Sequence, residues 1–190
     1  DHPVSLYAAT KRSNELLAHS YSNLYGIPST GLRFFTVYGP WGRPDMAPMI
    51  FAKQIMGNKP INVFNYGKML RDFTYIDDVV DCIYMICDKP AIKDIKFDYL
   101  NPLPSKSFAP HKIFNIGNSN PIVLTSFIEL LEREIGKKAI IKFEPMQKGD
   151  VISTSANMDN VKNWVGFEPK INIKDGIKKF IEWYKSYFSV

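Results

Sequence analysis

The sequence has 190 residues, 45% of them hydrophobic, and a formal net charge of +5 at pH 7, which suits one domain or two small ones with an ordinary soluble core. The basic residues are scattered, with no dense Lys/Arg run and no interleaved aromatic residues, so we expect no nucleic-acid partner. No apolar run reaches membrane-spanning length and no signal peptide is visible, so we expect no membrane partner and a cytoplasmic location.

A helix is predicted over residues 5–25, with Gly26 as its stop. Tyr7 and Lys11 are four residues apart, so a helix places both side chains on one face, one turn apart. An ammonium held near a phenol favours the phenolate, so the pair would let Tyr7 act as a base near neutral pH. The helix also carries an apolar stripe that would face the chain's own sheet; its members are Leu6, Leu17, Tyr21 and Leu24.

A strand is predicted over residues 29–37, with an apolar run typical of a parallel strand covered on both faces. Thr36 stands at its end, and ligands in open α/β sheets bind beyond the carboxyl ends of the strands. The Gly/Pro-rich loop at 38–45 holds Arg43, whose guanidinium suits a carboxylate or phosphate by forked hydrogen bonds. A helix is expected at 46–56.

The middle of the chain predicts a short strand at 61–64, a helix from 77 to about 87 and a long loop at 89–110. Asp77 and Asp78 open the helix, where acidic residues complement the positive end of the helix dipole. We therefore interpret them as caps and not as a metal pair, because a third ligand is missing.

Cysteines and histidines give no disulfide or metal signature. Cys82 and Cys87 lie five residues apart and off a shared helix face, so we expect buried thiols in a reducing compartment. His2, His19 and His111 do not sit at ligand spacing, so we expect them at the surface or in turns and expect no metal.

The last part of the chain alternates strands and helices. The predicted elements are a strand at 112–116, a helix at 124–135, a strand at 139–143, and helices at 157–165 and 174–187. Thr125 is expected to cap the helix at 124–135, and Gly136 is expected to end it. The final helix places apolar residues at i, i+3, i+4 and i+7, which indicates a buried face.

Four segments of the sequence are similar to motifs of a known enzyme family. They are VSLYAATK at 4–11, GLRFFTVYGPWGRPDM at 31–46, RDFTYIDDV at 71–79 and PMQKGDV at 145–151. In this order they resemble the extended short-chain dehydrogenase/reductase (NAD-dependent epimerase/dehydratase) family, and within it the UDP-glucuronate 4-epimerases of nucleotide-sugar metabolism. The sequence departs from that family because it contains no G-x-G-x-x-G turn for a dinucleotide pyrophosphate. We therefore expect a C-terminal portion that lacks the N-terminal dinucleotide-binding half.

The resemblance implies an α/β fold, the C-terminal part of an extended short-chain dehydrogenase Rossmann fold plus a small α/β substrate-binding domain. Residues 1–44 and 72–118 would form the remnant of the NAD-binding Rossmann domain. Residues 45–71 and 119–190 would form the nucleotide-sugar substrate-binding domain. The resemblance also implies a homodimer through the helix that carries Tyr7, and this contact and packing on the chain's own sheet could both occur, on different faces of the helix.

The resemblance implies an isomerase of polysaccharide biosynthesis, which inverts C4 of UDP-glucuronate through an NAD-dependent 4-keto intermediate. Tyr7 would take the proton of the sugar 4-hydroxyl. Lys11 would keep this tyrosine acidic and hold the nicotinamide ribose, so both residues would also be cofactor-binding. Phe34 and Val37 would line the nicotinamide side.

The sugar and base contacts are also implied by the resemblance. Thr36 and Arg43 would handle the carboxylate of the UDP-sugar substrate. Phe64 would stack on the uracil, although ordinary core packing suits this residue equally well.

The remaining contacts concern the phosphates and the ribose. Arg71 would reach the diphosphate, as would Gln147, although many relatives carry Arg at the latter position. Asp150 would accept hydrogen bonds from the ribose hydroxyls. Because the pyrophosphate turn is absent, we expect the 190-residue chain to be inactive, and to self-associate or be partly disordered over residues 1–40.

Three other readings stay open. A nucleotide-sugar dehydratase or decarboxylase of the same family would use the same Tyr/Lys pair. A non-catalytic remnant would bind a UDP-sugar or a partner chain alone. A nucleic-acid binder is the third reading, and it has only the net positive charge in its favour.

Overall fold

The computed structural model describes residues 2–190, which form two compact units. We call unit 1 the residues 2–34, 82–116 and 158–167, and unit 2 the residues 35–81, 117–157 and 168–190. Each unit therefore joins three stretches that are distant in the sequence. The boundaries lie elsewhere than those of the predicted domains, and the assignment of NAD to one domain and sugar to the other stays a prediction.

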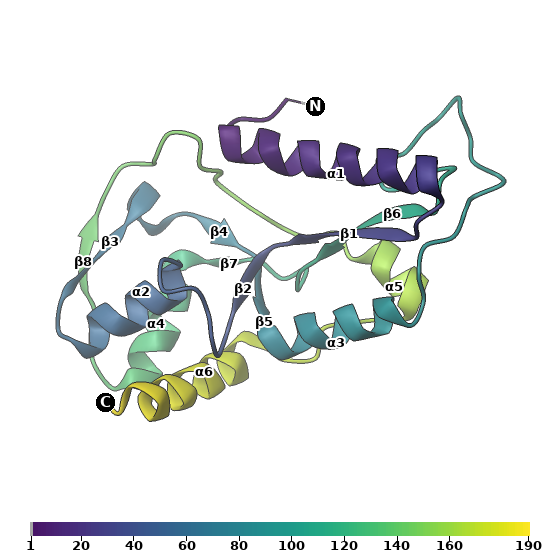
Figure 1. The fold of residues 1–190 in the computed structure, drawn as a ribbon. Coiled ribbons are helices and arrows are strands. Elements are labelled where there is room, and N and C mark those ends of the chain that lie inside the picture. Colours follow the sequence, from purple (N-terminus) through teal and green to yellow (C-terminus); the bar gives the residue numbers. More distant parts are fainter. Residues whose placement is uncertain (1) are drawn as a thin grey trace. The chain divides into compact units, whose positions relative to one another are not determined.

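Unit 1 is a helix packed along a pair of parallel strands (Figure 1). The helix is α1 (Leu6–Tyr25), and the strands are β1 (Ser29–Phe34) and β6 (His111–Ile116), which pair along their whole length. The short helix α5 (Asp159–Val165) also packs on β6. The long helix α3 (Ile76–Cys87) contributes residues to both units.

Helix α1 begins and ends where the sequence predicts. The Ser5 hydroxyl accepts a hydrogen bond from the amide of Ala8 (3.1 Å), which satisfies one of the free N–H groups of the first turn. Gly26 ends the helix with φ +67°, a conformation that side chains with a Cβ rarely adopt.

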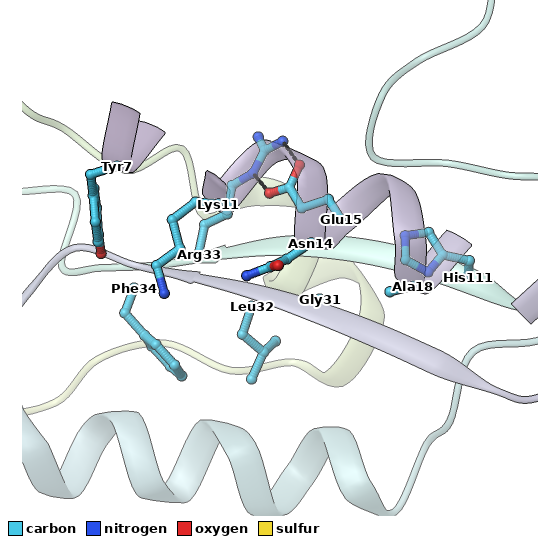
Figure 2. A pocket seen from close by; sticks show the side chains of 10 residues that line it. All are labelled: Tyr7, Lys11, Asn14, Glu15, Ala18, Gly31, Leu32, Arg33, Phe34 and His111. Carbon is cyan, nitrogen blue, oxygen red and sulfur yellow. Dashed lines mark hydrogen bonds and ion pairs between the residues drawn. The ribbon is translucent and has the colours of Figure 1, made fainter. Parts of the chain in front are cut away.

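The apolar stripe of α1 does not face the chain's own sheet, so that reading is wrong. All four of its members are exposed to solvent: Leu6, Leu17, Tyr21 and Leu24. The face that α1 turns toward β1 instead carries the side chains of Tyr7, Lys11 and Glu15 (Figure 2).

The strand predicted over residues 29–37 is broken in two. β1 ends at Phe34, and β2 (Thr36–Tyr38) begins after Phe35, with the amide of Val37 bonded to the Phe35 carbonyl (3.0 Å). The parallel pairing of β1 is confirmed, but its predicted burial on both faces is wrong because the Phe34 side chain is 49% exposed.

Unit 2 contains three strand pairs and three longer helices. β2 pairs in parallel with β5 (Phe73–Tyr75), β3 (Pro60–Val63) pairs in parallel with β8 (Ile140–Phe143), and β4 (Leu70–Arg71) pairs antiparallel with β7 (Ile122–Val123). The remaining elements are α2 (Ala47–Met56), the 3-10 turn η1 (Phe64–Gly67), α4 (Leu124–Ile135) and α6 (Ile173–Phe188).

The core of unit 2 lies where α4 meets α2 and α6. The Phe127 ring of α4 stacks on Phe73 with centroids 4.1 Å apart, and Tyr38 meets both rings edge-on. The apolar face predicted for the last helix is confirmed, since all four of its members are buried: Ile177, Phe180, Ile181 and Tyr184. Unit 2 thus has a continuous apolar core of its own.

One predicted cap is wrong, that of Thr125, while Asp77 and Asp78 lie in the first turn of α3 as predicted. Helix α4 is preceded by Val123, and no side chain caps it, so Thr125 lies inside the first turn instead. Asp78 is buried, and its carboxylate accepts hydrogen bonds from the backbone amides of Lys170 (3.1 Å) and Ile171 (3.0 Å). It therefore fastens the segment that leads into α6. Gly136 ends α4 with φ +82°, as predicted.

Residues 88–110 contain no helix or strand, which confirms the predicted loop. Cys82 is buried as expected, but Cys87 is exposed, which corrects the prediction of two buried thiols. Among residues 2–190, no helix combines the length and the apolar composition that crossing a bilayer requires.

Candidate functional site

Tyr7 and Lys11 lie on one face of α1, as their spacing predicts. The Lys11 Nζ lies 5.3 Å from the centre of the Tyr7 ring. Figure 2 shows the phenol oxygen and the amine nitrogen pointing from α1 in the same direction, toward β1 and the ring of Phe34. The geometry suits a phenol with a nearby cation, while the catalytic role of the pair stays a prediction.

These two side chains line a pocket of about 520 Å³ within unit 1. Its walls are the face of α1 from Tyr7 to Ala18 and the β1 residues from Gly31 to Phe34, with His111 contributed by β6 (Figure 2). The open aromatic ring of Phe34 and the side chain of Leu32 give it an apolar side opposite the polar groups of α1.

A salt bridge that sequence reasoning missed joins the two walls of this pocket. Arg33 on β1 donates to Glu15 on α1 through Nε (2.6 Å) and Nη2 (2.8 Å), and Arg12 adds a third hydrogen bond (2.8 Å; Figure 2 shows the Arg33 pair). The hydrogen bond from Arg33 lowers the pKa of Glu15. The pair lies 18 residues apart in sequence, and no local pattern signals such a contact.

A second pocket, of about 590 Å³, lies within unit 2. Five of the six predicted substrate residues line it: Thr36, Phe64, Arg71, Gln147 and Asp150. They come from β2, η1, β4 and the loop after β8, so the fold gathers side chains that are up to 114 positions apart, from 36 to 150.

The sixth predicted substrate residue, Arg43, does not line this pocket. Its guanidinium is exposed and donates through Nε to the carboxylate of Asp45 (3.1 Å), and Asp45 is a lining residue. The two predicted nicotinamide residues also separate, because Phe34 belongs to unit 1 while Val37 belongs to unit 2 and lines neither of these pockets.

Arg71 is held in a fixed position on β4. Its Nη1 donates to the carbonyls of Leu70 (2.9 Å) and Ile152 (3.3 Å), and its Nη2 donates to the carboxylate of Asp150 (2.8 Å). The ion pair is mostly shielded from solvent, with 14% of the Arg71 side chain exposed. The guanidinium is thus held by two backbone carbonyls and one carboxylate, while its predicted role in binding the diphosphate stays a prediction.

The loop that carries Asp150 is held against β4 by the backbone. The amide of Leu70 donates to the carbonyl of Ile152 (3.0 Å), and the amide of Thr154 donates back to Leu70 (3.1 Å). These bonds fix the distance between Arg71 and Asp150, which are 79 residues apart in sequence.

Asp72 is a fully buried carboxylate to which the sequence analysis assigned no role. It accepts hydrogen bonds from the backbone amides of Asn118 (2.9 Å), Ser119 (3.0 Å) and Ala156 (2.8 Å). Gly117 permits this approach, because a Cβ there would lie 2.9 Å from the Asp72 carboxylate. Asp72 therefore ties β5 to two loops of unit 2. The only hint of this role in the sequence is its position directly after Arg71, within a segment that carries predicted site residues.

Among residues 2–190, no three side chains of His, Cys, Asp or Glu gather in a way that could hold a metal ion. His111 is buried and His19 is half-buried, which corrects the expected surface or turn positions. The His19 Nε2 lies 2.6 Å from the Ser107 hydroxyl, and the two imidazole rings meet edge-on with centroids 5.3 Å apart.

Comparison with known proteins gives a family match over residues 1–117, to a family described as the NAD dependent epimerase/dehydratase family. Protein CapI of Staphylococcus aureus is 50% identical over 99% of this chain and 56% of its own length. A probable UDP-glucuronate 4-epimerase of Rhizobium meliloti is 44% identical over 97% of this chain and 54% of its own length.

A solved structure is also similar. The UDP-glucuronic acid 4-epimerase from Bacillus cereus, in complex with UDP-glucuronic acid and NAD, matches with a TM-score of 0.83 and 31% identity. The match covers 98% of this chain and 54% of that one. The chain thus spans about half the length of the relatives it matches, and its likeness confirms the predicted α/β fold of the extended short-chain dehydrogenase type.

Proposed function

The chain belongs to the NAD dependent epimerase/dehydratase family, and from this premise we propose that its residues serve the inversion of C4 in UDP-glucuronate. The observation that carries the proposal is the pocket of unit 2, where a threonine, an aromatic ring, an arginine, a glutamine and an aspartate meet. This set matches the parts of a UDP-sugar: a flat aromatic base, a ribose, a diphosphate and an uncharged or acidic sugar ring.

The residues of unit 1 fit one end of NAD. The Tyr7 hydroxyl and the Lys11 amine can hold the nicotinamide ribose, and the exposed Phe34 ring offers an apolar contact for the nicotinamide. Val37 is proposed for the same role. The 190 residues contain no G-x-G-x-x-G turn for the pyrophosphate. When bound, NAD takes up and returns the hydride of the sugar C4.

Tyr7 moves the proton in this proposal. Its phenolate removes the proton from the sugar 4-hydroxyl and returns it to the oxygen of the 4-epimer. The Lys11 amine lies 5.3 Å from the centre of the Tyr7 ring, on the same face of α1. In this proposal Lys11 is the residue that orients and assists Tyr7 during proton transfer.

Three residues contact the diphosphate and the ribose of the substrate in this proposal. Arg71 and Gln147 bind the diphosphate, with the Arg71 guanidinium already aligned by Leu70 and Ile152. The Asp150 carboxylate accepts hydrogen bonds from the ribose hydroxyls.

The sugar and base ends of the substrate have their own contacts. Thr36 and Arg43 hold the carboxylate, which replaces Asp45 on the arginine. Phe64 stacks on the base.

The exposed apolar stripe of α1 supports a homodimer as part of this proposal. Two copies that bring these faces together would cover leucine and tyrosine side chains that unit 1 leaves in water. Replacement of Leu17 by lysine would then shift sedimentation toward the monomer, and an unchanged sedimentation coefficient would contradict the dimer. A cytoplasmic location and a role in polysaccharide biosynthesis complete the proposal.

Calorimetric titration with UDP-glucuronate and UDP-glucose tests the proposed substrate. We expect the sugar acid to bind about tenfold more tightly, because a forked arginine–carboxylate pair adds charge-assisted hydrogen bonds. Arg43→Ala should remove this preference and leave UDP-glucose affinity unchanged. Equal affinity of the wild-type chain for both sugars would overturn the glucuronate assignment.

Turnover is tested separately, by incubation with UDP-glucuronate and NAD and analysis of the products. For the 190-residue chain we expect UDP-glucuronate to bind without conversion, since no pyrophosphate turn is present. Formation of UDP-galacturonate at a steady rate would contradict that expectation. A 4-keto-6-deoxy sugar or a pentose product would instead identify a dehydratase or a decarboxylase.

A further inference from the structure

Helix α2 presents one polar side chain to the pocket of unit 2. Ala47, Ile50 and Gln54 follow the i, i+3, i+7 spacing of a single helix face, and all three line the pocket. Lys53 points elsewhere: it lines a separate hollow, which Gln54 also borders. Gln54 is therefore the one polar residue among the three on the pocket face of α2.

The side-chain amide of Gln54 makes no hydrogen bond within residues 2–190. Its Oε1 is shielded from solvent and accepts no hydrogen bond, and within residues 2–190 its Nε2 donates none. A shielded acceptor without a partner is costly and uncommon in folded proteins, where nearly all such groups are paired. The amide can also turn about its last torsion without breaking a bond, because nothing holds either end.

The pocket residues that directly follow α2 in the chain, within 60–64, are mostly apolar, with Asn62 of β3 as the exception. Ile50 lies one turn before Gln54 on α2, while Ile61 and Phe64 come from the strand and turn that follow. The charged groups of the pocket, Asp45, Arg71 and Asp150, lie on other elements. A pocket that is lined by an amide, aliphatic side chains and an aromatic ring suits a flat heterocycle that carries polar atoms at its edge.

We infer that Gln54 binds the edge of the base in the bound nucleotide. Its Oε1 accepts a hydrogen bond from the uracil N3–H, and its Nε2 donates one to the uracil O4. This inference rests on the proposed function, which places a UDP-sugar in this pocket. The uracil edge offers a donor next to an acceptor, and a carboxamide is the side chain that matches both at once. Arg71 and Asp150 cannot supply this contact if they hold the diphosphate and ribose.

The test is calorimetric titration with UDP and with UDP methylated at N3, which lacks the N3–H and keeps the charge. The wild-type chain should bind UDP about tenfold more tightly than the methylated form. Gln54→Leu should weaken UDP binding and bring the ratio between the two ligands close to one. Lys53→Leu, on the same helix but outside this pocket, should keep the full ratio.

Thermal unfolding of each variant provides the folding control, and Gln54→Ala is a second variant should the leucine fail to fold. A Gln54→Leu chain that folds, binds UDP and keeps the wild-type ratio would overturn the inference alone. Absence of UDP binding to the wild-type chain would overturn the proposed function, and this inference with it.

Discussion

Unit 2 and unit 1 place their large apolar side chains differently. In unit 2, helices α2, α4 and α6 turn their apolar faces inward, and Phe127, Leu131 and Phe180 are fully buried. In unit 1, helix α1 turns Leu17, Leu24 and its neighbours outward, and Leu24 is 71% exposed. The same residue type at helical spacing thus marks a core in one unit and an open surface in the other.

This difference in apolar packing shows that the two candidate pockets are held in place by different interactions. The pocket of unit 2 rests on a continuous core that the same unit supplies, so its lining residues are held by packing. The pocket of unit 1 is held by hydrogen bonds and charge, through Glu15, Arg33 and Arg12, along one helix and two strands. We therefore expect unit 2 to dominate the stability of the chain.

The largest expected effect comes from the same substitution made in each unit. Leu131→Ala on α4 leaves a cavity at a fully buried site, and we expect a loss of about 2–5 kcal/mol in the free energy of unfolding. Leu100→Ala, in the loop of unit 1 and outside the apolar stripe of α1, is the control at an exposed site, and we expect a change within about 0.5 kcal/mol. Urea unfolding measures both, and equal losses would break the comparison.

A smaller effect is expected at Asp72, the buried carboxylate that ties β5 to two loops. Asp72→Asn replaces one acceptor oxygen by a donor that faces backbone N–H groups, and we expect a loss of about 2 kcal/mol. The same change at exposed Asp81 serves as the control. Thermal unfolding of the two variants decides, and similar melting temperatures would contradict the structural role of Asp72.

The smallest expected effect is a pH dependence in unit 1. Burial and the neighbouring imidazole of His19 lower the pKa of His111 below its usual 6.5, while Glu15 acts in the opposite direction. Below about pH 6.5 the unfolded chain therefore binds more protons than the folded chain, and stability falls as the pH drops toward the lowered value.

His111→Phe removes this titration and keeps an aromatic ring at the buried site. We expect the urea midpoint of the wild-type chain to fall between pH 7 and pH 5 by more than that of the variant. His2→Phe, at an exposed site, is the control and should follow the wild type. If the urea midpoints of the wild type and His111→Phe changed with pH in parallel, this account of the histidine pair would be contradicted.

Helices with strong periodicity were predictable from the sequence. The expected spans of α1, α4 and α6 agree with the structure to within a residue or two at each end. The two-residue strands β4 and β7 were missed because they exist only through their pairing, in which Leu70 meets Val123 across 53 positions. The break at Phe35 likewise follows from pairing with different strands on either side of it.

The candidate site was predictable in its residue types and less so in its contacts. The spacing of Tyr7 and Lys11 predicts their shared helix face, because only local geometry is needed. The ion pair of Arg71 with Asp150 and the uncommitted amide of Gln54 depend on tertiary burial, which no spacing along the chain encodes.

Calorimetric titration of UDP into the wild-type chain and into Arg71→Gln tests the central claim, that the pocket of unit 2 receives a diphosphate on Arg71. We predict binding by the wild type and a loss of about tenfold or more in Arg71→Gln. Arg133→Gln, at an exposed arginine of α4 outside this pocket, should keep the wild-type affinity. No UDP binding, or equal losses in the two variants, would contradict the account.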